Sequence, residues 1–267
     1  MVEKSNPIGI FDSGVGGLSI AAAVHRLFPA ESLLYFADRA NFPYGGRSEE
    51  QVRHLARAAA QFLIGQDAKL VVVACNTASS VALPLLRSRF SVPFVGVVPG
   101  VKPGSAVSRA AHVGVLATAT TFQTRVFSEL TEQFAEGVEI RCQVCPDLVA
   151  LVEAGEVDSP RVDALIARDL APLVEAGVDT LVLGCTHYSF LVRALKRAAP
   201  LGVTIIDTAV PVARQVGRVL EERGLLNPPG CQGSVRLCAS DSEEEFRRVA
   251  EKLWPQAAAS AAIGLRR

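Results

Sequence analysis

The sequence predicts an α/β fold made of two similar three-layer α/β domains with mainly parallel sheets, related by a pseudo-two-fold axis. Short apolar runs alternate with longer segments of helical periodicity, which is typical of parallel α/β architecture. Four of these runs recur in the same order in the second half of the chain. The length of 267 residues also suits two domains of about 150 residues each.

In the first half, each apolar run ends at a polar or glycine-containing turn, as a strand does before a loop. Uninterrupted runs of Val and Leu are typical of strands that are buried on both faces. In chain order we expect a strand over Ile8–Phe11, a glycine-rich loop over 14–17, a helix ending near Pro29, a strand over Leu33–Phe36, a helix from about Ser48, and a strand over Leu70–Ala74.

The second half repeats this pattern. The matching pairs are Ile8–Phe11 with Val113–Leu116, Leu34–Phe36 with Ile140–Val144, Val72–Thr77 with Leu181–His187, and Val92–Val95 with Val203–Ile206. Gly114 follows Gly9 by 105 positions (114 minus 9), and Cys185 follows Cys75 by 110 (185 minus 75). Any two buried strands look alike, so one match means little, but four in one order favour two similar halves.

The repeat predicts the domain boundaries. We expect residues 1–97 together with 208–267 to form the first domain, and residues 98–207 to form the second. Helical patterns over 212–222 and 243–253 fall outside the repeat, and we expect them to pack against the first half. The alanine-rich stretch 256–262 is predicted to be a frayed tail.

Composition excludes several classes of function. Lys plus Arg and Asp plus Glu both number 27, so the net charge is zero and no nucleic-acid partner is expected. No apolar run approaches the ~20 residues that span a bilayer, and the first residues lack the apolar core of a secretion signal, so no membrane contact is expected. Six cysteines are too few for a disulfide scaffold, and we expect reduced thiols in a cytoplasmic protein.

Polar residues follow the predicted strands at the carboxyl ends, where open parallel sheets bind their ligands. The residues at these positions are Asp12, Ser13, Asp38, Cys75, Asn76, Thr77, Thr118, Cys185, Thr186, His187 and Asp207. Of the four histidines, His187 alone belongs to such a cluster, because His25, His54 and His112 occupy predicted helix or surface positions.

Cys75 and Cys185 are the most informative of these residues. Each ends a predicted buried strand and precedes small residues that can cap a helix, whose N-terminus favours a thiolate over a thiol. A lone cysteine there would more often fill core space, but two at matching positions of a repeat favour chemistry. Two facing thiols suit racemisation or epimerisation, in which a proton leaves one face of Cα and another arrives at the opposite face. Asp12 and His187 are placed to shift the thiol pKa values.

The glycine-rich loop offers a different interpretation, a dinucleotide site, with Asp38 in the position of a ribose-binding acid. The spacing falls short, because Ser19 replaces the last glycine or alanine of that fingerprint. Asp12 would also repel a pyrophosphate, whereas it could accept an ammonium group. We therefore expect no dinucleotide cofactor.

Two further pairs of cysteines have spacings that bear on redox or metal chemistry. Cys142 and Cys145 have redox-motif spacing, yet they lie along a predicted strand rather than opening a helix. Cys231 and Cys238 are seven positions apart in a loop-and-strand region and do not complete a zinc site. The sequence therefore predicts neither a metal nor a cofactor.

Four motifs give the chain a resemblance to a known family. They are Asp12-Ser13-Gly14-Val15-Gly16-Gly17-Leu18-Ser19, Ala37-Asp38 followed by Pro43-Tyr44-Gly45, Ala74-Cys75-Asn76-Thr77-Ala78-Ser79, and Gly184-Cys185-Thr186-His187-Tyr188. In this order they resemble the bacterial glutamate racemases over nearly the whole chain. Aspartate and hydantoin racemases carry the paired cysteines without this particular first loop.

The resemblance implies cofactor-independent interconversion of L- and D-glutamate in a cleft between two α/β domains. The enzyme would be a cytoplasmic homodimer that supplies D-glutamate for peptidoglycan. Cys75 and Cys185 would be the two acid/base residues, assisted by Asp12 and His187. Asp12 and His187 would also help to bind the substrate, whose charged groups would be held by Ser13, Tyr44, Gly45, Asn76, Thr77 and Thr186.

Two positions depart from the family pattern. Ser189 stands where a proline is usual, and Thr120 stands where a glycine is common. Because Thr120 could shift a helix start near Thr118, we leave Thr118 out of the expected site. Two other functions stay open: a racemase for aspartate or another small amino acid, and a catalytically silent amino-acid-binding protein on the same fold.

Overall fold

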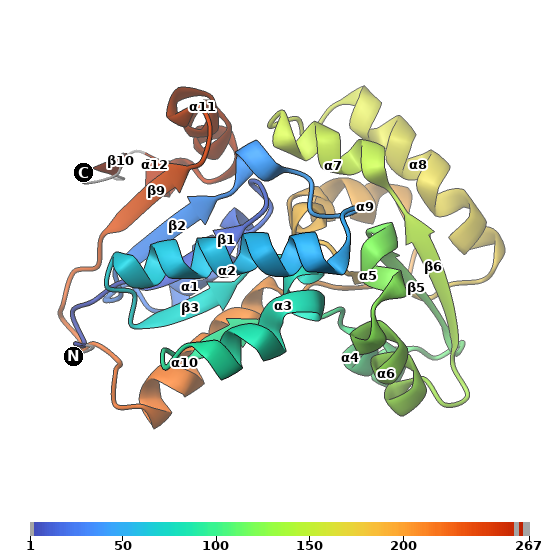
Figure 1. Cartoon of the computed structure of the whole chain (residues 1–267). Coiled ribbons are helices and arrows are strands. Elements are labelled where there is room, and N and C mark those ends of the chain that lie inside the picture. Colours follow the sequence, from blue (N-terminus) through green and yellow to red (C-terminus); the bar gives the residue numbers. More distant parts are fainter. Residues whose placement is uncertain (1–2, 259–261, 264–267) are drawn as a thin grey trace.

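The computed structural model describes residues 3–258 and 262–263, which form two parallel β-sheets covered by helices (Figure 1). Within these residues the first sheet has six strands: β1 (Ile8–Asp12), β2 (Leu33–Ala37), β3 (Leu70–Val73), β4 (Phe94–Gly96), β9 (Val235–Ala239) and β10 (Ala262–Ile263). The second has four: β5 (His112–Ala117), β6 (Glu139–Val144), β7 (Thr180–Leu183) and β8 (Thr204–Ile206). The predicted α/β fold with parallel sheets is confirmed.

Helices connect the strands and pack against the sheets (Figure 1). In chain order they are α1 (Leu18–Leu27), η1 (Arg39–Asn41), α2 (Glu49–Gly65), α3 (Asn76–Arg89), α4 (Val101–Val107), α5 (Ala119–Gln123), α6 (Arg125–Phe134), α7 (Pro146–Glu153), α8 (Pro160–Glu175), η2 (Thr186–Leu191), α9 (Val192–Ala198), α10 (Ala209–Glu222), α11 (Glu243–Leu253) and α12 (Pro255–Ala258). The start predicted near Ser48 is confirmed, because Ser48 Oγ accepts from the Gln51 N–H and the Ser48 N–H donates to Gln51 Oε1.

The two sheets share one strand order. The order β2-β1-β3-β4 in the first sheet corresponds to β6-β5-β7-β8 in the second. Gly9 pairs with Val71 in the first sheet, and Gly114 pairs with Leu181 in the second. These pairings keep the sequence offsets of 105 (114 minus 9) and 110 (181 minus 71). The repeat predicted from the sequence is therefore a repeat of topology and register.

The strands that carry the candidate residues run through the interior. Every residue of β1, β3 and β7 is buried, as expected for strands covered on both faces. The edge strand β6 is mostly exposed. The residues that directly follow β1, β3 and β7 therefore lie at the ends of buried strands.

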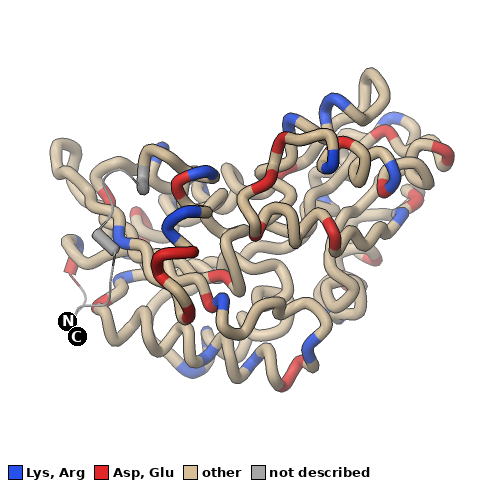
Figure 2. Tube along the Cα trace, turned by 90° about the horizontal axis from the view of Figure 1, so that it is seen from above, with Lys and Arg blue, Asp and Glu red and all other residues tan. Residues whose placement is uncertain are grey.

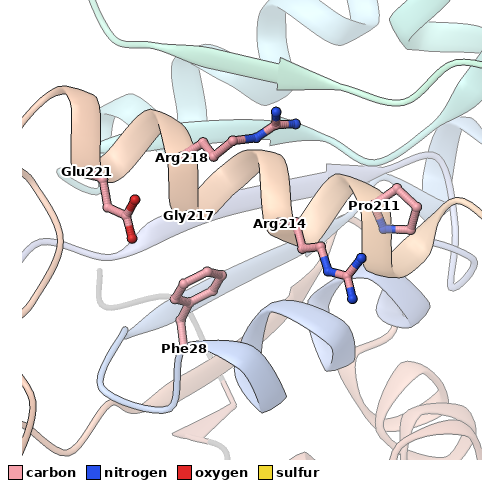
Figure 3. A pocket seen from close by; sticks show the side chains of 6 residues that line it. All are labelled: Phe28, Pro211, Arg214, Gly217, Arg218 and Glu221. Carbon is pink, nitrogen blue, oxygen red and sulfur yellow. The ribbon is translucent and has the colours of Figure 1, made fainter.

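After residue 208 the chain returns to the first sheet. β9 pairs with β2, and α10 packs beside α1, as predicted for this part of the chain. Gly217 of α10 allows this approach, because a Cβ there would lie 2.1 Å from Cζ of Phe28. An open groove of about 580 Å³ runs along α10 beside this contact, with Arg214 and Glu221 on its wall (Figure 3).

The predicted frayed tail is wrong at both of its ends. Residues 256–258 belong to α12, which begins at Pro255, a residue whose fixed φ suits a first helical turn. Ala262 begins β10, which pairs with β9 and forms the edge of the first sheet. Residues 259–261 of the predicted tail lie outside the described residues.

Basic and acidic residues are interspersed along the Cα trace (Figure 2). This distribution agrees with the equal numbers of basic and acidic residues, 27 each. In the part of the chain that the structure describes, no helix is long and apolar enough to cross a membrane.

Candidate active site

One cavity lies where the carboxyl ends of strands from both sheets meet. It is lined by all ten residues that the sequence predicted, namely Asp12, Ser13, Tyr44, Gly45, Cys75, Asn76, Thr77, Cys185, Thr186 and His187. Phe42, Pro43, Thr118, Val149 and Gly184 complete the lining. The structure therefore brings these ten residues, which come from both halves of the chain, to one cavity.

The cavity is small. Its volume is about 30 Å³, enough for only one or two water molecules. A larger, mainly apolar pocket of about 360 Å³ adjoins it, and the two share Phe42, Pro43, Gly45, Thr118 and Val149. An amino acid does not fit the small cavity without movement of the lining.

The glycine-rich loop between β1 and α1 makes room for side chains of the second half. A Cβ at Gly14 would lie 1.9 Å from Glu153 Oε1, and one at Gly16 would lie 2.5 Å from His187 Nδ1. The Val15 N–H in the same loop donates to Glu153 Oε1 over 2.8 Å. The loop therefore allows the two halves to approach closely beside the cavity.

Cys75 follows β3 and is the N-cap residue of α3. Its thiol is buried, and Sγ lies 3.9 Å from Ser13 Oγ. Burial raises the pKa of Cys75, the charge of Asp12 raises it further, and a hydrogen bond from the Ala78 N–H lowers it by less. The predicted preference for a thiolate is therefore wrong for Cys75, because desolvation and a neighbouring carboxylate outweigh the helix N-terminus.

Cys185 occupies the matching position of the second half, after β7 and before η2. Its Sγ lies 3.5 Å from His187 Nδ1, and Nε2 of the same ring lies 2.6 Å from Glu153 Oε1. Burial lowers the pKa of His187, but a thiolate at Cys185 and the carboxylate of Glu153 together raise it well above its ordinary value. A protonated His187 is a cation suited to stabilise a thiolate beside it.

Glu153, at the end of α7, is a site residue that the sequence analysis missed. Burial raises the pKa of Glu153, but the hydrogen bond and charge of His187 outweigh it and the pKa is lowered. Glu153 and His187 are 34 positions apart, and no local motif joins them. A buried histidine that orients a reactive group needs a partner for its second nitrogen, which predicts that a partner exists but not which residue it is.

Asp12 ends β1 and contacts both halves. Its Oδ1 accepts from the Ser13 N–H over 2.6 Å and from Ser13 Oγ over 3.1 Å, and its Oδ2 accepts from Thr186 Oγ1 over 2.9 Å. Burial raises the pKa of Asp12, against the opposing charge of His187 and the Thr186 hydrogen bond. The carboxyl group thus links the two strand ends and acts electrostatically on Cys75.

The polar side chains around the cavity differ in whether they already have partners. Oδ1 and Nδ2 of Asn76 are both buried without a hydrogen-bond partner, which makes this amide the best candidate to bind a polar ligand. The Tyr44 hydroxyl, by contrast, donates to Asp38 Oδ2 over 2.6 Å. Thr77 Oγ1 lies 3.1 Å from Thr118 Oγ1, across the two halves.

Thr118 lines the cavity although the sequence analysis left it out. It is the N-cap residue of α5 and its Oγ1 accepts from the Thr121 N–H, so Thr120 does not displace the helix start. Thr120 Oγ1 instead accepts from the Gly46 N–H over 2.6 Å. Ser189 Oγ donates to Asp207 Oδ1 over 2.8 Å, which ties the segment behind His187 to the end of β8.

The prediction that Cys142 and Cys145 lie along one strand is wrong. Cys142 is exposed in β6, whereas Cys145 is buried and is the N-cap residue of α7, because Pro146 starts that helix. Neither cysteine is among the residues that line the cavity. Within residues 3–258 and 262–263, no group of three or more His, Cys, Asp or Glu side chains is arranged to hold a metal ion.

Comparison with known proteins gives consistent matches over most of the chain. Residues 18–216 match the family model described as Asp/Glu/Hydantoin racemase. A glutamate racemase from a Roseiflexus species is 45% identical over 253 residues, which cover 94% of this chain and 93% of that protein.

Solved structures are similar over the same extent. The crystal structure of a glutamate racemase isoform from Bacillus anthracis has a TM-score of 0.88 at 32% identity and covers 99% of both chains. The Escherichia coli glutamate racemase, solved in complex with L-glutamate and the activator UDP-MurNAc-Ala, has a TM-score of 0.82 at 32% identity. That match covers 93% of this chain and 95% of the other.

Proposed function

Because the chain belongs to the Asp/Glu/hydantoin racemase family, we propose that it interconverts L- and D-glutamate without a cofactor. The observation that carries the proposal is the pair Cys75 and Cys185, which come from different halves and line one cavity. The similar Escherichia coli enzyme was solved with L-glutamate, which supports this substrate. The cysteine pair supplies the two acid/base groups that racemisation requires.

In each turnover a proton leaves one face of Cα and another reaches the opposite face. The thiolate of one cysteine takes the Cα proton, and the electron pair of the broken C–H bond stays on the substrate. The thiol of the other cysteine then gives its proton to Cα, which completes the inversion. The two sulfurs have exchanged protonation states, so the pair is ready for the reverse reaction.

The surroundings of the cysteines suit this cycle before substrate binds. The raised pKa of Cys75 keeps a proton on that sulfur, and a protonated His187 offers a counter-ion for a thiolate at Cys185. One thiol and one thiolate is the combination that a single turnover requires.

The polar lining supports binding of a zwitterion. The unpaired amide of Asn76 and the first N–H groups of α3 suit a carboxylate, with Ser13, Thr77 and Thr186 as further hydroxyl partners. Asp12, from the first half of the repeat, suits the ammonium group. His187 lines the cavity from the second half. Tyr44 and Gly45 contribute through the backbone, since the Tyr44 hydroxyl is engaged by Asp38.

The proposal includes the setting of the reaction. The enzyme would act as a cytoplasmic homodimer, and its D-glutamate would supply peptidoglycan precursors. Cys75, Cys142, Cys145, Cys185 and Cys231 have free thiols, which supports a reducing compartment. Residues 1–97 with 208–267 and residues 98–207 would be the units that move apart to admit substrate, which is supported by the division of the strands between the two sheets.

Incubation with single amino acids in D₂O tests the function. We expect loss of the Cα proton signal and decay of optical rotation with L- and with D-glutamate, and neither with the Cys75→Ser/Cys185→Ser double variant. The same changes with aspartate alone would indicate the related racemase. No exchange with any amino acid would indicate the binding protein instead.

A further inference from the structure

Arg39, the first residue of η1, lies among three carboxylates. Its side chain is only 15% exposed, and its Nε lies 3.9 Å from Glu153 Oε2. The other two nitrogens of the guanidinium lie near the other two carboxylates: Nη1 is 3.4 Å from Asp241 Oδ1, and Nη2 is 3.9 Å from Glu245 Oε2. Nη1 is buried and makes no hydrogen bond. Because an unsatisfied buried donor costs free energy, this placement calls for a functional explanation.

Two of the three carboxylates belong to the same half of the molecule as Arg39. Asp241 and Glu245 lie just after β9, at the start of α11. The Ala40 N–H donates to Ser240 Oγ over 2.9 Å, which holds η1 against this segment. The guanidinium therefore has partners within its own half.

The third carboxylate, Glu153, comes from the other half. Its Oε1 already accepts from the Val15 N–H and from His187 Nε2. Arg39 faces the remaining oxygen, Oε2. A line of contacts thus runs from Arg39 through Glu153 and His187 to the sulfur of Cys185, 3.5 Å from the ring.

We propose that Arg39 is a positioning residue for the racemase reaction, holding Glu153 Oε2 so that Oε1 stays on His187. This inference rests on the proposed function. The cavity of about 30 Å³ must widen to admit an amino acid, so the contact between Arg39 and Glu153 breaks and re-forms as the halves part and close. Asp241 and Glu245 keep the guanidinium in place meanwhile, so that it re-engages without reordering a long side chain.

Three variants test the inference. Arg39→Gln removes the charge, Arg39→Lys keeps a cation, and Arg248→Gln is the matched control, because Arg248 pairs with Glu244 on the exposed face of α11. We expect Arg39→Gln to lower kcat/KM about fivefold, the size of a moderate ion pair, with Arg39→Lys recovering most of the loss. The loss in kcat/KM should be equal for L- and D-glutamate. The two enantiomers have equal free energies, so the equilibrium constant is one and the kcat/KM values of the two directions must stay equal.

A second measurement does not depend on activity. The chain has four histidines, so the imidazole ¹⁵N–¹H signals of labelled protein are few. In Arg39→Gln the Nε2–H signal of His187 is expected to move upfield and to exchange with water about fivefold faster. Arg248→Gln leaves this signal unchanged.

An unchanged His187 signal and unchanged kcat/KM in Arg39→Gln overturn the inference. Equal losses in the glutamine and lysine variants, accompanied by equal losses in thermal stability, overturn it too, because they indicate a purely structural role. If the unaltered protein does not racemise glutamate, the proposed function fails, while the His187 signal still decides whether Arg39 positions Glu153.

Discussion

The two halves of the molecule have the same strand order but different chemistry at the carboxyl ends of matching strands. β1 ends in Asp12, whereas β5 ends in Ala117 at the same offset of 105 (117 minus 12). Cys75 precedes the long helix α3, whereas Cys185 precedes the 3-10 helix η2, which carries His187. A carboxylate therefore acts on one thiol and an imidazole on the other. The repeated fold places the two sulfurs alike, but it surrounds them with different ionisable groups.

Replacing each sulfur in turn tests this comparison with the largest expected effect. Cys75→Ser and Cys185→Ser are each expected to lower kcat/KM for racemisation about 10⁴-fold, because both proton transfers lie on one path and a serine hydroxyl is a poor base. Each variant keeps one thiol, so each should still exchange the Cα proton of one enantiomer in D₂O. The two variants should differ in which enantiomer exchanges.

Cys238→Ser is a suitable control, because Cys238 is a buried cysteine of β9 outside the cavity lining. It should racemise glutamate at close to the normal rate. Substantial racemisation by either Cys75→Ser or Cys185→Ser, or exchange of the same enantiomer by both, would contradict the two-base assignment.

The halves also differ at the amino ends of the matching strands. Lys69 precedes β3 and Asp179 precedes β7, again at an offset of 110 (179 minus 69). Lys69 is fully buried, lies 2.5 Å from Glu31 and donates to the carbonyl oxygens of Lys4 and Leu225. Asp179 is partly exposed and accepts from Ser108 Oγ and from two backbone N–H groups. One half uses a buried ion pair where the other uses a capped loop.

Removal of the buried cation should have the second largest effect. Lys69→Met is expected to lower the free energy of unfolding by about 3–5 kcal/mol, because Glu31 is left charged and buried without its partner. Urea unfolding followed by circular dichroism measures this loss. In the double variant Lys69→Met/Glu31→Gln the uncompensated charge is gone, and more than half of the loss should be recovered. A double variant no more stable than Lys69→Met would show that packing, and not charge, dominates at this position.

His187 is expected to matter for both rate and stability. His187→Gln should lower kcat/KM about 10²-fold, through loss of the cation beside Cys185. Because the pKa of His187 is raised in the folded protein, its protonation stabilises the fold fully below its ordinary pKa of about 6.5. That contribution is lost as the pH rises through the folded-state pKa.

The difference in Tm between the protein and His187→Gln should therefore be largest below the ordinary histidine pKa of about 6.5, and it should shrink as the pH rises through the raised pKa of His187 in the folded protein. Thermal unfolding across this range measures it. His54→Gln, at an exposed position of α2, is the control and should show no such trend. A difference that grows with pH would contradict a charged His187.

The sequence predicted much of the site because its residues come directly after buried strands. Cys75 and Cys185 each stand two positions beyond a run of aliphatic residues, and that pattern needs no knowledge of the fold. Glu153 could not be predicted in this way. It reaches His187 because Gly14 leaves room for Glu153 of α7 and Gly16 leaves room for His187 of η2, which are contacts between distant segments.

The prediction that Cys75 prefers the thiolate form was wrong for a related reason. The helix N-terminus is visible in the sequence, but the depth of burial and the charge of Asp12, 63 positions away, appear only in the folded protein. The end of the chain shows the same limit. A short, alanine-rich segment carries little periodicity, so the pairing of β10 with β9 follows from an available sheet edge rather than from local pattern.

The smallest expected effect concerns Asp179, which occupies the position in the second half that matches Lys69 in the first. Burial raises the pKa of Asp179, but the Ser108 hydroxyl and the N–H groups of Ala110 and Arg109 outweigh it and lower the pKa to about 2. Such a group stabilises the fold above its ordinary pKa of about 3.9 and ceases to do so as the pH falls through about 2. Asp179→Asn should therefore cost about 0.5–1 kcal/mol at neutral pH, discounted for solvent exposure, and less in acid. Because Asp179 lies at the opposite end of β7 from Cys185, kcat/KM should be unchanged. A loss as large as that of Lys69→Met would mean that the capped loop and the buried ion pair support their halves equally, and the contrast between the two amino ends would fail.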